Sequence, residues 1–229
     1  MAKLTFHGHA TFSIETEDGT RIVIDPWFDE NPVSDVTSEE VGEVDYIFCT
    51  HGHTDHFEDA IPLAKRTGAT LVASAEIAGF AETQGVENVH PMHIGGAFQF
   101  PFGRAKMTPA LHGGQVHGDE TGTFTTVPGG FLLNVDGVGV YHAGDTALLG
   151  DMRFLEGQVD FALLPIGDNF TMGPDDAVRA TELIHPRVVV PMHFNTWEPI
   201  AQDPEAFRKM MGDRARVEVM EPGDTIPLG

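Results

Sequence analysis

The sequence contains a single cysteine, Cys49, among its 229 residues. One cysteine excludes an intramolecular disulfide, and it also excludes a structural zinc site built from several thiolates. Any metal ion in this protein must therefore be held by histidine and carboxylate side chains.

Basic residues are also scarce. Lys and Arg together number 13 against 35 Asp and Glu, which gives a formal net charge of -22 and an isoelectric point near 4.6. Such a surface repels nucleic acids and anionic membranes at long range, so we expect neither as a partner. A high-salt source and an ordinary acidic protein both fit this composition.

Long apolar runs are absent. No stretch approaches the ~20 apolar residues that a membrane-spanning helix needs. The N-terminal residues, MAKLTFHGHATFSIE, lack the apolar core and cleavage signal of a secretory leader, so we expect a cytoplasmic protein. With 41% hydrophobic residues and neither a linker nor a repeat, the economical prediction is one domain over residues 1–229.

Short apolar or alternating runs between turn residues predict strands through the first half of the chain. They lie at Lys3–His7, Ala10–Thr16, Arg21–Asp25, Asp45–Cys49, Thr70–Ser74, Gly103–Leu111 and Gly130–Tyr141, with helices at Glu58–Thr67 and Ala75–Thr83. Strands and helices then alternate at Phe161–Pro165, Pro174–Ile184, Arg187–Met192 and Pro204–Met211. Asp18-Gly19 and Asp136-Gly137 predict hairpin turns. This order of elements predicts an α/β or α+β layered fold.

Histidine, by contrast, is plentiful, and three of the 12 histidines lie in one dense cluster. The segment Thr50–His56 reads THGHTDH and follows a predicted buried strand. His51 and His53 are two residues apart, so a turn at the glycine between them can aim both at one ion. Asp55 and His56 point differently, which suits a second ion beside the first. Imidazole and carboxylate are typical ligands of Zn²⁺, Mn²⁺ and Fe²⁺. A loop that is rich in histidine by chance is the alternative.

Four residues cannot complete two coordination spheres, so other segments must supply ligands. Three ligand-type residues each come shortly after a predicted apolar strand and next to a turn, namely His112, Asp145 and His193. Functional side chains often lie on loops just beyond strand ends, which makes these three the candidates.

These residues resemble the motif series of the metallo-β-lactamase superfamily, over nearly the whole chain. The series consists of HxHxDH, then a lone His, a Gly-Asp and a late His, here His51–His56, His112, Gly144-Asp145 and His193. Further segments resemble a family of largely uncharacterised metal-dependent hydrolases. That family is related to ascorbate-6-phosphate lactonase and, more distantly, to N-acylphosphatidylethanolamine phospholipase D. The segments are Gly8–Ala10, Ile24–Pro26, Tyr141–Thr146, Leu164–Pro174 and Pro191–Thr196.

The resemblance implies a four-layer αββα sandwich, formed as a single hydrolase domain with its site at one edge of the two sheets. It also implies two divalent metal ions as cofactors, with zinc first and manganese, iron or nickel as alternatives. The implied ligands are His51, His53 and His112 for the first ion, Asp55, His56 and His193 for the second, and Asp145 as a bridge between both.

The implied chemistry is hydrolysis. Two ions roughly 3.5–4 Å apart can share a bridging water and lower its pKa towards neutrality. The hydroxide then attacks a small ester, lactone or phosphoester. Asp55 borders the bridging position, so we predict that it accepts the proton of the nucleophile.

Several other residues are candidates to orient a ligand or to line the pocket. Asp25, at the end of a strand, could accept a hydrogen bond from the second nitrogen of a ligand histidine, or it could be a turn residue before proline. His9 and His142 are candidates for the same role or for the pocket, and packed histidines are the alternative. Asp168 and Asn169 could orient substrate or a ligand, or they could simply form a helix-entry loop.

Three competing functions can be weighed from the sequence. Di-iron redox enzymes of this fold typically carry Glu at the second His of HxHxDH, so His53 favours hydrolysis. Nucleases of the superfamily usually have a basic clamping domain, which is not visible here. A metal-dependent metabolite-binding or sensor protein without turnover remains the alternative to an enzyme. The expected partner is a small-molecule substrate, and by analogy with related lactonases a homo-oligomer is open.

Overall fold

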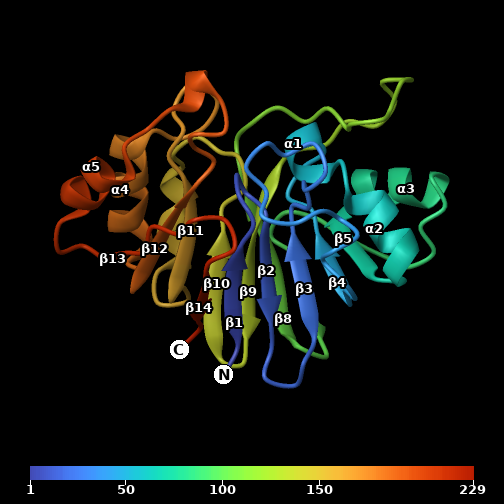
Figure 1. Cartoon of the computed structure of the whole chain (residues 1–229), viewed down its shortest axis with the longest axis horizontal. Helices are drawn as coiled ribbons and strands as arrows, with labels where there is room; N and C mark the ends of the chain where they lie inside the picture. Colours follow the sequence, from blue (N-terminus) through green and yellow to red (C-terminus); the bar gives the residue numbers. More distant parts are fainter.

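The computed structural model describes all 229 residues and contains two seven-stranded mixed sheets that pack face to face. Helices α1–α3 flank one sheet, and α4 and α5 flank the other (Figure 1). The predicted four-layer αββα sandwich is therefore confirmed.

The first sheet has the strand order β14-β1-β2-β3-β4-β5-β6. Strands from β14 to β3 are antiparallel neighbours, whereas β3 to β6 are parallel neighbours. The bounds are β1 Lys3–Phe6, β2 Phe12–Glu15, β3 Arg21–Ile24, β4 Tyr46–Phe48, β5 Thr70–Ser74, β6 Val89–Met92 and β14 Thr225–Pro227.

The second sheet repeats this plan in the order β13-β12-β11-β10-β9-β8-β7. Strands β7 to β10 are antiparallel neighbours, and β10 to β13 are parallel neighbours. The bounds are β7 Ala97–Phe100, β8 Gly103–Pro109, β9 Gly129–Val135, β10 Val138–His142, β11 Phe161–Pro165, β12 Val188–Met192 and β13 Arg216–Val217.

The helices are short. They are α1 Thr54–Phe57, α2 Ala60–Thr67, α3 Ala75–Thr83, α4 Pro174–Ile184 and α5 Pro204–Met211, with 3₁₀ turns η1 Gly150–Leu155 and η2 Glu198–Ile200. None of them combines the length and hydrophobicity needed to span a lipid bilayer.

The larger core includes apolar side chains from the facing sides of the two sheets. Phe48 of β4 and Phe131 of β9 meet edge to face with ring centroids 5.1 Å apart. A second cluster lies between the first sheet and its helices, where Leu63 of α2 and Ile77 of α3 are fully buried. The apolar side chains of the strands are thus covered, by the other sheet on one face and by helices on the other.

Four elements differ from the sequence prediction. A one-turn helix, α1, begins inside the THGHTDH motif, and α2 starts at Ala60 rather than Glu58. Strands β6 and β7 were not predicted, because they are edge strands with several exposed residues. In β6, Pro91 also interrupts the usual strand pattern.

The topology brings several loops to one end of the sandwich. Asp25 follows β3, the THGHTDH motif follows β4, and His112, Asp145 and His193 follow β8, β10 and β12. In open α/β sheets, ligand sites form beyond the carboxyl ends of such strands, and this end is where the candidate residues gather.

Candidate metal centre

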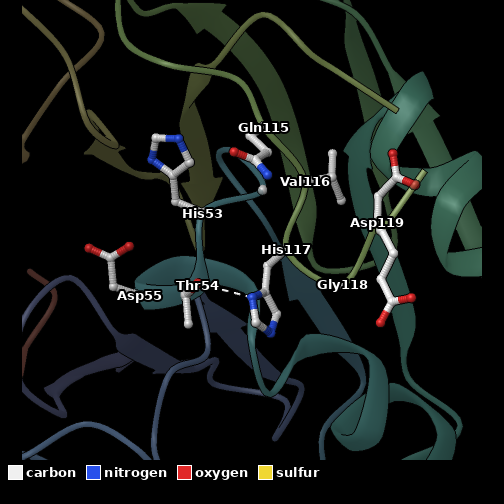
Figure 2. A pocket seen from close by; sticks show the side chains of 10 residues that line it. His53, Thr54, Asp55, Gln115, Val116, His117, Gly118 and Asp119 are labelled. Carbon is white, nitrogen blue, oxygen red and sulfur yellow. Dashed lines mark hydrogen bonds between the residues drawn. The ribbon is translucent and has the colours of Figure 1, made fainter. Parts of the chain in front are cut away.

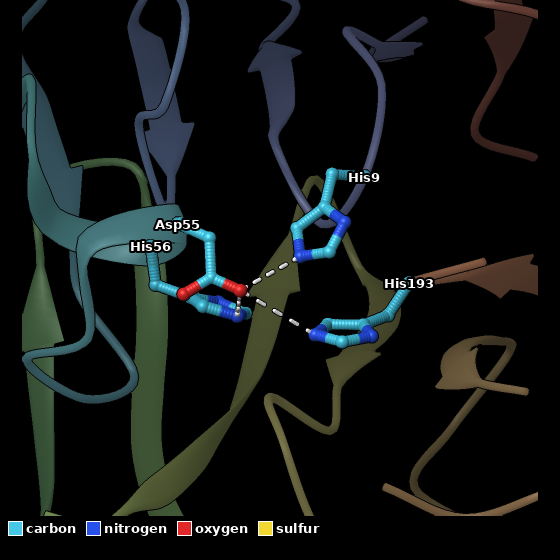
Figure 3. Close-up of side chains that lie close together, drawn as sticks. All are labelled: His9, Asp55, His56 and His193. Atoms are coloured by element: carbon cyan, nitrogen blue, oxygen red, sulfur yellow. Dashed lines mark hydrogen bonds and ion pairs between the residues drawn. The ribbon is translucent and has the colours of Figure 1, made fainter. Parts of the chain in front are cut away.

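The predicted ligand residues form two neighbouring groups. The side-chain nitrogens of His51, His53 and His112 lie within 4.8 Å of one another. A second group with the same spread consists of His9, Asp55, His56 and His193. Figure 3 shows Asp55 between the three imidazoles of this second group.

Asp145 lies between the two groups. Its Oδ2 is 3.4 Å from His112 Nε2 and 3.9 Å from His51 Nε2, on the side of the first group. The same oxygen is 3.1 Å from His193 Nε2, and Oδ1 is 3.2 Å from His56 Nε2, on the side of the second. One carboxylate therefore faces both groups, as a bridging ligand would.

Left-handed backbone conformations are concentrated here. His9, Asp25 and His193 have φ angles of 57°, 49° and 56°. Such angles are uncommon for residues other than glycine, and they often occur at functional sites where the surrounding structure holds them. At His193 the turn follows directly after β12 and directs the imidazole toward Asp145.

Asp25 holds the buried side of the centre in place. It accepts hydrogen bonds from the backbone N–H and the hydroxyl of Thr50, both 2.7 Å long, and from His56 Nδ1 at 2.8 Å. Thr50 Oγ1 in turn lies 3.0 Å from His51 Nδ1. These bonds leave the Nε2 atoms of His51 and His56 free to face the centre, which is the arrangement typical of metal-ligating histidines.

His9 packs edge-on against two tryptophans that also contact each other, and its contacts were only partly foreseen. Its Nε2 is 3.0 Å from Asp55 Oδ2, and its Nδ1 is 2.7 Å from Thr196 Oγ1. The rings of Trp27 and Trp197 lie 5.2 and 5.0 Å from the imidazole. Trp27, Thr196 and Trp197 have no ligand-like spacing in the sequence, and the only hint was their position within or next to the segments Ile24–Pro26 and Pro191–Thr196.

The other candidates lie away from the centre's interior. His142 is a packed core residue whose Nε2 donates to the Ala10 carbonyl across the sheets and whose Nδ1 accepts from Gly144 N–H. It thus supports the turn that carries Asp145. Asp168 and Asn169 are exposed, and neither side chain forms a hydrogen bond with a ligand residue. Their loop is tied to the centre through its backbone instead, since Met172 N–H donates to Thr146.

Unpartnered buried atoms test whether the centre fits a metal ion. Five side-chain atoms here form no hydrogen bond of good geometry, although some lie close to Asp145: Nε2 of His51 and His56, Oδ1 of Asp145, and both ring nitrogens of His193. Buried polar atoms without a partner are costly and rare. All but one of these atoms face the shared space between the two groups, so the donor set fits divalent ions of the imidazole- and carboxylate-binding kind.

The charges in the centre favour a cation. Burial works against the ionised form of Asp145, but the charges of His193 and His56 hold its pKa well below the usual range. Burial also opposes protonation of His193, yet the charge of Asp145 raises its pKa to about 9. The pKa of His51, by contrast, is lowered well below its ordinary value, chiefly by burial. The carboxylates therefore create a potential that stabilises positive charge.

An open pocket of about 480 Å³ adjoins the centre, lined by residues 52–55 and 115–120 (Figure 2). In this lining, His117 hydrogen-bonds Thr54 Oγ1 through Nδ1 at 2.9 Å. Gly52 is needed for close approach rather than for a left-handed turn, because a Cβ there would lie 2.8 Å from Val116 Cα. The lining contains no Lys or Arg.

Comparison with known proteins places the chain in a family. A family profile described as a β-lactamase superfamily domain matches residues 20–194. A UPF0173 metal-dependent hydrolase from Shouchella clausii is 49% identical, over 99% of this chain and 100% of the relative. One from Heliobacterium modesticaldum is 47% identical, over 100% and 98%.

A solved structure supports the same conclusion. Igni18, described as a metallo hydrolase from the hyperthermophilic archaeon Ignicoccus hospitalis, superposes with a TM-score of 0.88 at 38% identity, covering 98% of this chain and 97% of that one. The two sheets, the metal-ligating residue types gathered at their shared edge and these relatives agree. The chain belongs to the β-lactamase superfamily and, within it, to the UPF0173 metal-dependent hydrolases.

Proposed function

We propose that this protein is a dinuclear hydrolase that acts on a small ester, lactone or phosphoester. The observation that carries the proposal is the position of Asp145, whose carboxylate lies between two groups of ligand-type side chains, with Oδ2 close to His112 of the first and His193 of the second. A single-ion site would need neither the second group nor a carboxylate between them.

The proposed ligand sets follow the two groups. They are His51, His53 and His112 for one ion, Asp55, His56 and His193 for the other, and Asp145 for both. When bound, two divalent ions would activate a water molecule as nucleophile and polarise the bond under attack. Zinc is the first candidate, because it accepts mixed imidazole and carboxylate ligands, and manganese, iron and nickel are alternatives.

Asp55 is the proposed proton acceptor. Its Oδ2 accepts a hydrogen bond from His9 Nε2 at 3.0 Å, and the side chain is partly exposed on the pocket side. Burial lowers the pKa of His9 to about 4, so the ring is neutral near pH 7. Its Nδ1 then accepts a hydrogen bond from the Thr196 hydroxyl, and its Nε2–H donates to the Asp55 carboxylate and holds it in place.

The pocket lining favours uncharged substrates over phosphoesters. It contains Asp55, Asp119 and Glu120 but no basic side chain to hold a phosphate. Gln115 and His117 can offer hydrogen bonds to a carbonyl or hydroxyl group. We therefore rank esters and lactones first, and we propose a cytoplasmic enzyme without a nucleic-acid or membrane partner, in line with the net charge of -22.

The test measures metal content and turnover together. Protein reconstituted with Zn²⁺ or Mn²⁺ should bind two ions per chain and hydrolyse members of an ester, lactone and phosphodiester panel. Asp145→Ala should lower the metal content and abolish turnover. Asp213→Ala, which removes an exposed carboxylate with no side-chain partner, is the matched control and should change neither.

Unchanged metal content in Asp145→Ala would contradict the ligand assignment. One ion per chain in the wild type would contradict the dinuclear site. Inactivity over the whole panel, together with tight binding of a metabolite, would favour a metal-dependent sensor instead.

A further inference from the structure

A second cavity lies on the opposite side of the second sheet from the inter-sheet core. It has a volume of about 260 Å³ and is enclosed between strands β8 and β10 and the turn η1. None of the ten residues that line it is a candidate metal ligand. At ~30 Å³ per water molecule, the space equals roughly nine waters, which is enough for a small organic molecule.

Two buried hydroxyls in this cavity have no partner other than each other. Tyr141 Oη and Thr108 Oγ1 interact with one another, and they are the only buried side-chain polar atoms outside the metal centre that lack a hydrogen bond of good geometry. Tyr141 is completely buried, and Thr108 is nearly so. Both line the cavity. A contact between two hydroxyls satisfies only one of their two O–H donors. Because an unpartnered buried donor is costly, the pair indicates a site for a ligand that accepts hydrogen bonds.

Lys106 adds a cation to the same wall. The strand register places Lys106 of β8, Leu132 of β9 and Tyr141 of β10 in one row across the sheet. Lys106 forms no ion pair in a chain that has only 13 Lys and Arg, although 35 acidic residues are available. Burial raises the pKa of Tyr141, so its phenol keeps its proton and can donate it. Three donors thus line one cavity.

The remainder of the cavity is mainly apolar. Leu149 and Phe154 lie on its η1 side, and Phe154 is 64% exposed although it is a large aromatic residue. Asp151, also on this side, is exposed and adds one negative charge at the rim. A ligand with an apolar body and a single negative charge matches this lining better than a dianion.

We propose that this cavity binds a small apolar monocarboxylate. Its carboxylate accepts hydrogen bonds from the Tyr141 and Thr108 hydroxyls and pairs with the Lys106 ammonium. Its apolar body packs against Leu149 and Phe154. The site is separate from the metal centre and does not depend on the function proposed for it.

The test uses phenylacetate as the probe and metal-loaded protein. Isothermal titration calorimetry should show one site, and 2-phenylethanol, which has a similar body without the charge, should bind at least about tenfold more weakly. Lys106→Gln and Tyr141→Phe should each weaken phenylacetate binding by about tenfold. Lys209→Gln, which removes an exposed lysine without an ion pair, is the matched control and should keep the wild-type affinity.

The design separates this cavity from carboxylate binding at the metal ions. If phenylacetate binds Lys106→Gln and Tyr141→Phe as tightly as the wild type, it binds elsewhere and the proposal is wrong. Absence of binding at millimolar phenylacetate, or equal affinity for 2-phenylethanol, would also overturn it. Lys106→Gln replaces a half-exposed side chain, so it gives a clear answer even if Tyr141→Phe fails to fold.

Discussion

Asp25 shows how one carboxylate can set the chemistry of a neighbour. It is fully buried and accepts three hydrogen bonds, one of them from His56 Nδ1. That bond keeps the ring proton on Nδ1 and leaves Nε2 as the atom that faces Asp145 at 3.2 Å. The carboxylate thereby selects the tautomer that can ligate an ion.

Asp25→Asn should therefore weaken metal binding without removing a ligand. The amide would offer an N–H group toward His56 Nδ1, which favours the tautomer with its proton on Nε2. We expect metal affinity to fall by about 10- to 100-fold, measured by competition with a chromophoric chelator. Asp213→Asn is the control, and equal affinities of both variants would contradict this role of Asp25.

The sequence could predict much of the centre at the residue scale, because HxHxDH and the three residues after strand ends are ligand types in a recognisable order. The structure brings all seven together with Asp145 between the groups. It could not predict the contacts of Trp27 and Trp197 with His9, since these depend on loops distant in sequence. Strands and metal-ligand motifs produce a recognisable pattern in the sequence, whereas contacts between distant loops do not.

At the scale of elements, local chemistry decided which predictions held. The turn at Asp136-Gly137 joins β9 and β10 with φ angles of 50° and 83°, as a primed hairpin turn requires. The helix α5 begins at Pro204 after Asp203, whose side chain accepts from Glu205 and Ala206 N–H. The short helix α1 was missed because four residues carry no helical period.

Helix α3 contains a glycine whose replacement should raise the stability of the protein. Gly79 lies in the middle of Ala75–Thr83, and a Cβ there would meet no atom within 4 Å. Gly79→Ala should stabilise the protein by about 0.5–1 kcal/mol, because alanine loses less backbone entropy in a helix. Thermal unfolding should show a Tm higher by about 1–4 °C.

Gly139→Ala is the contrasting variant. In β10 a Cβ at this position would lie 2.0 Å from the Gln158 carbonyl oxygen, so the strand would have to shift. We expect its Tm to fall. A lower Tm for Gly79→Ala as well would show that α3 has less space than its geometry indicates.

At the scale of the whole molecule, the net charge of -22 is the dominant feature. Seven of the ion pairs between basic and acidic side chains or the N-terminus are exposed pairs, and such pairs contribute little. Repulsion among the remaining carboxylates should destabilise the compact state at low ionic strength.

Added salt should therefore stabilise the protein. We expect the Tm of the metal-loaded protein to rise between about 20 mM and about 500 mM NaCl. Above about 0.1 M salt, the Debye length falls below about 10 Å, so repulsion between surface carboxylates is screened over short distances. Differential scanning calorimetry at constant metal concentration is the measurement. A Tm that is flat or falls over this range would mean that the acidic residues are already balanced within the fold.

The loops that supply the candidate ligands come from both sheets, four ligands after β4 and three after β8, β10 and β12. Ions held there would also fasten one half of the sandwich to the other. Any ligand bound only by the folded chain stabilises it by mass action, by about 2.7 kcal/mol at one hundred times its Kd. The lifetime of this protein in a cell would then follow the supply of its metal. A cell starved of that metal would lose folded protein along with the activity.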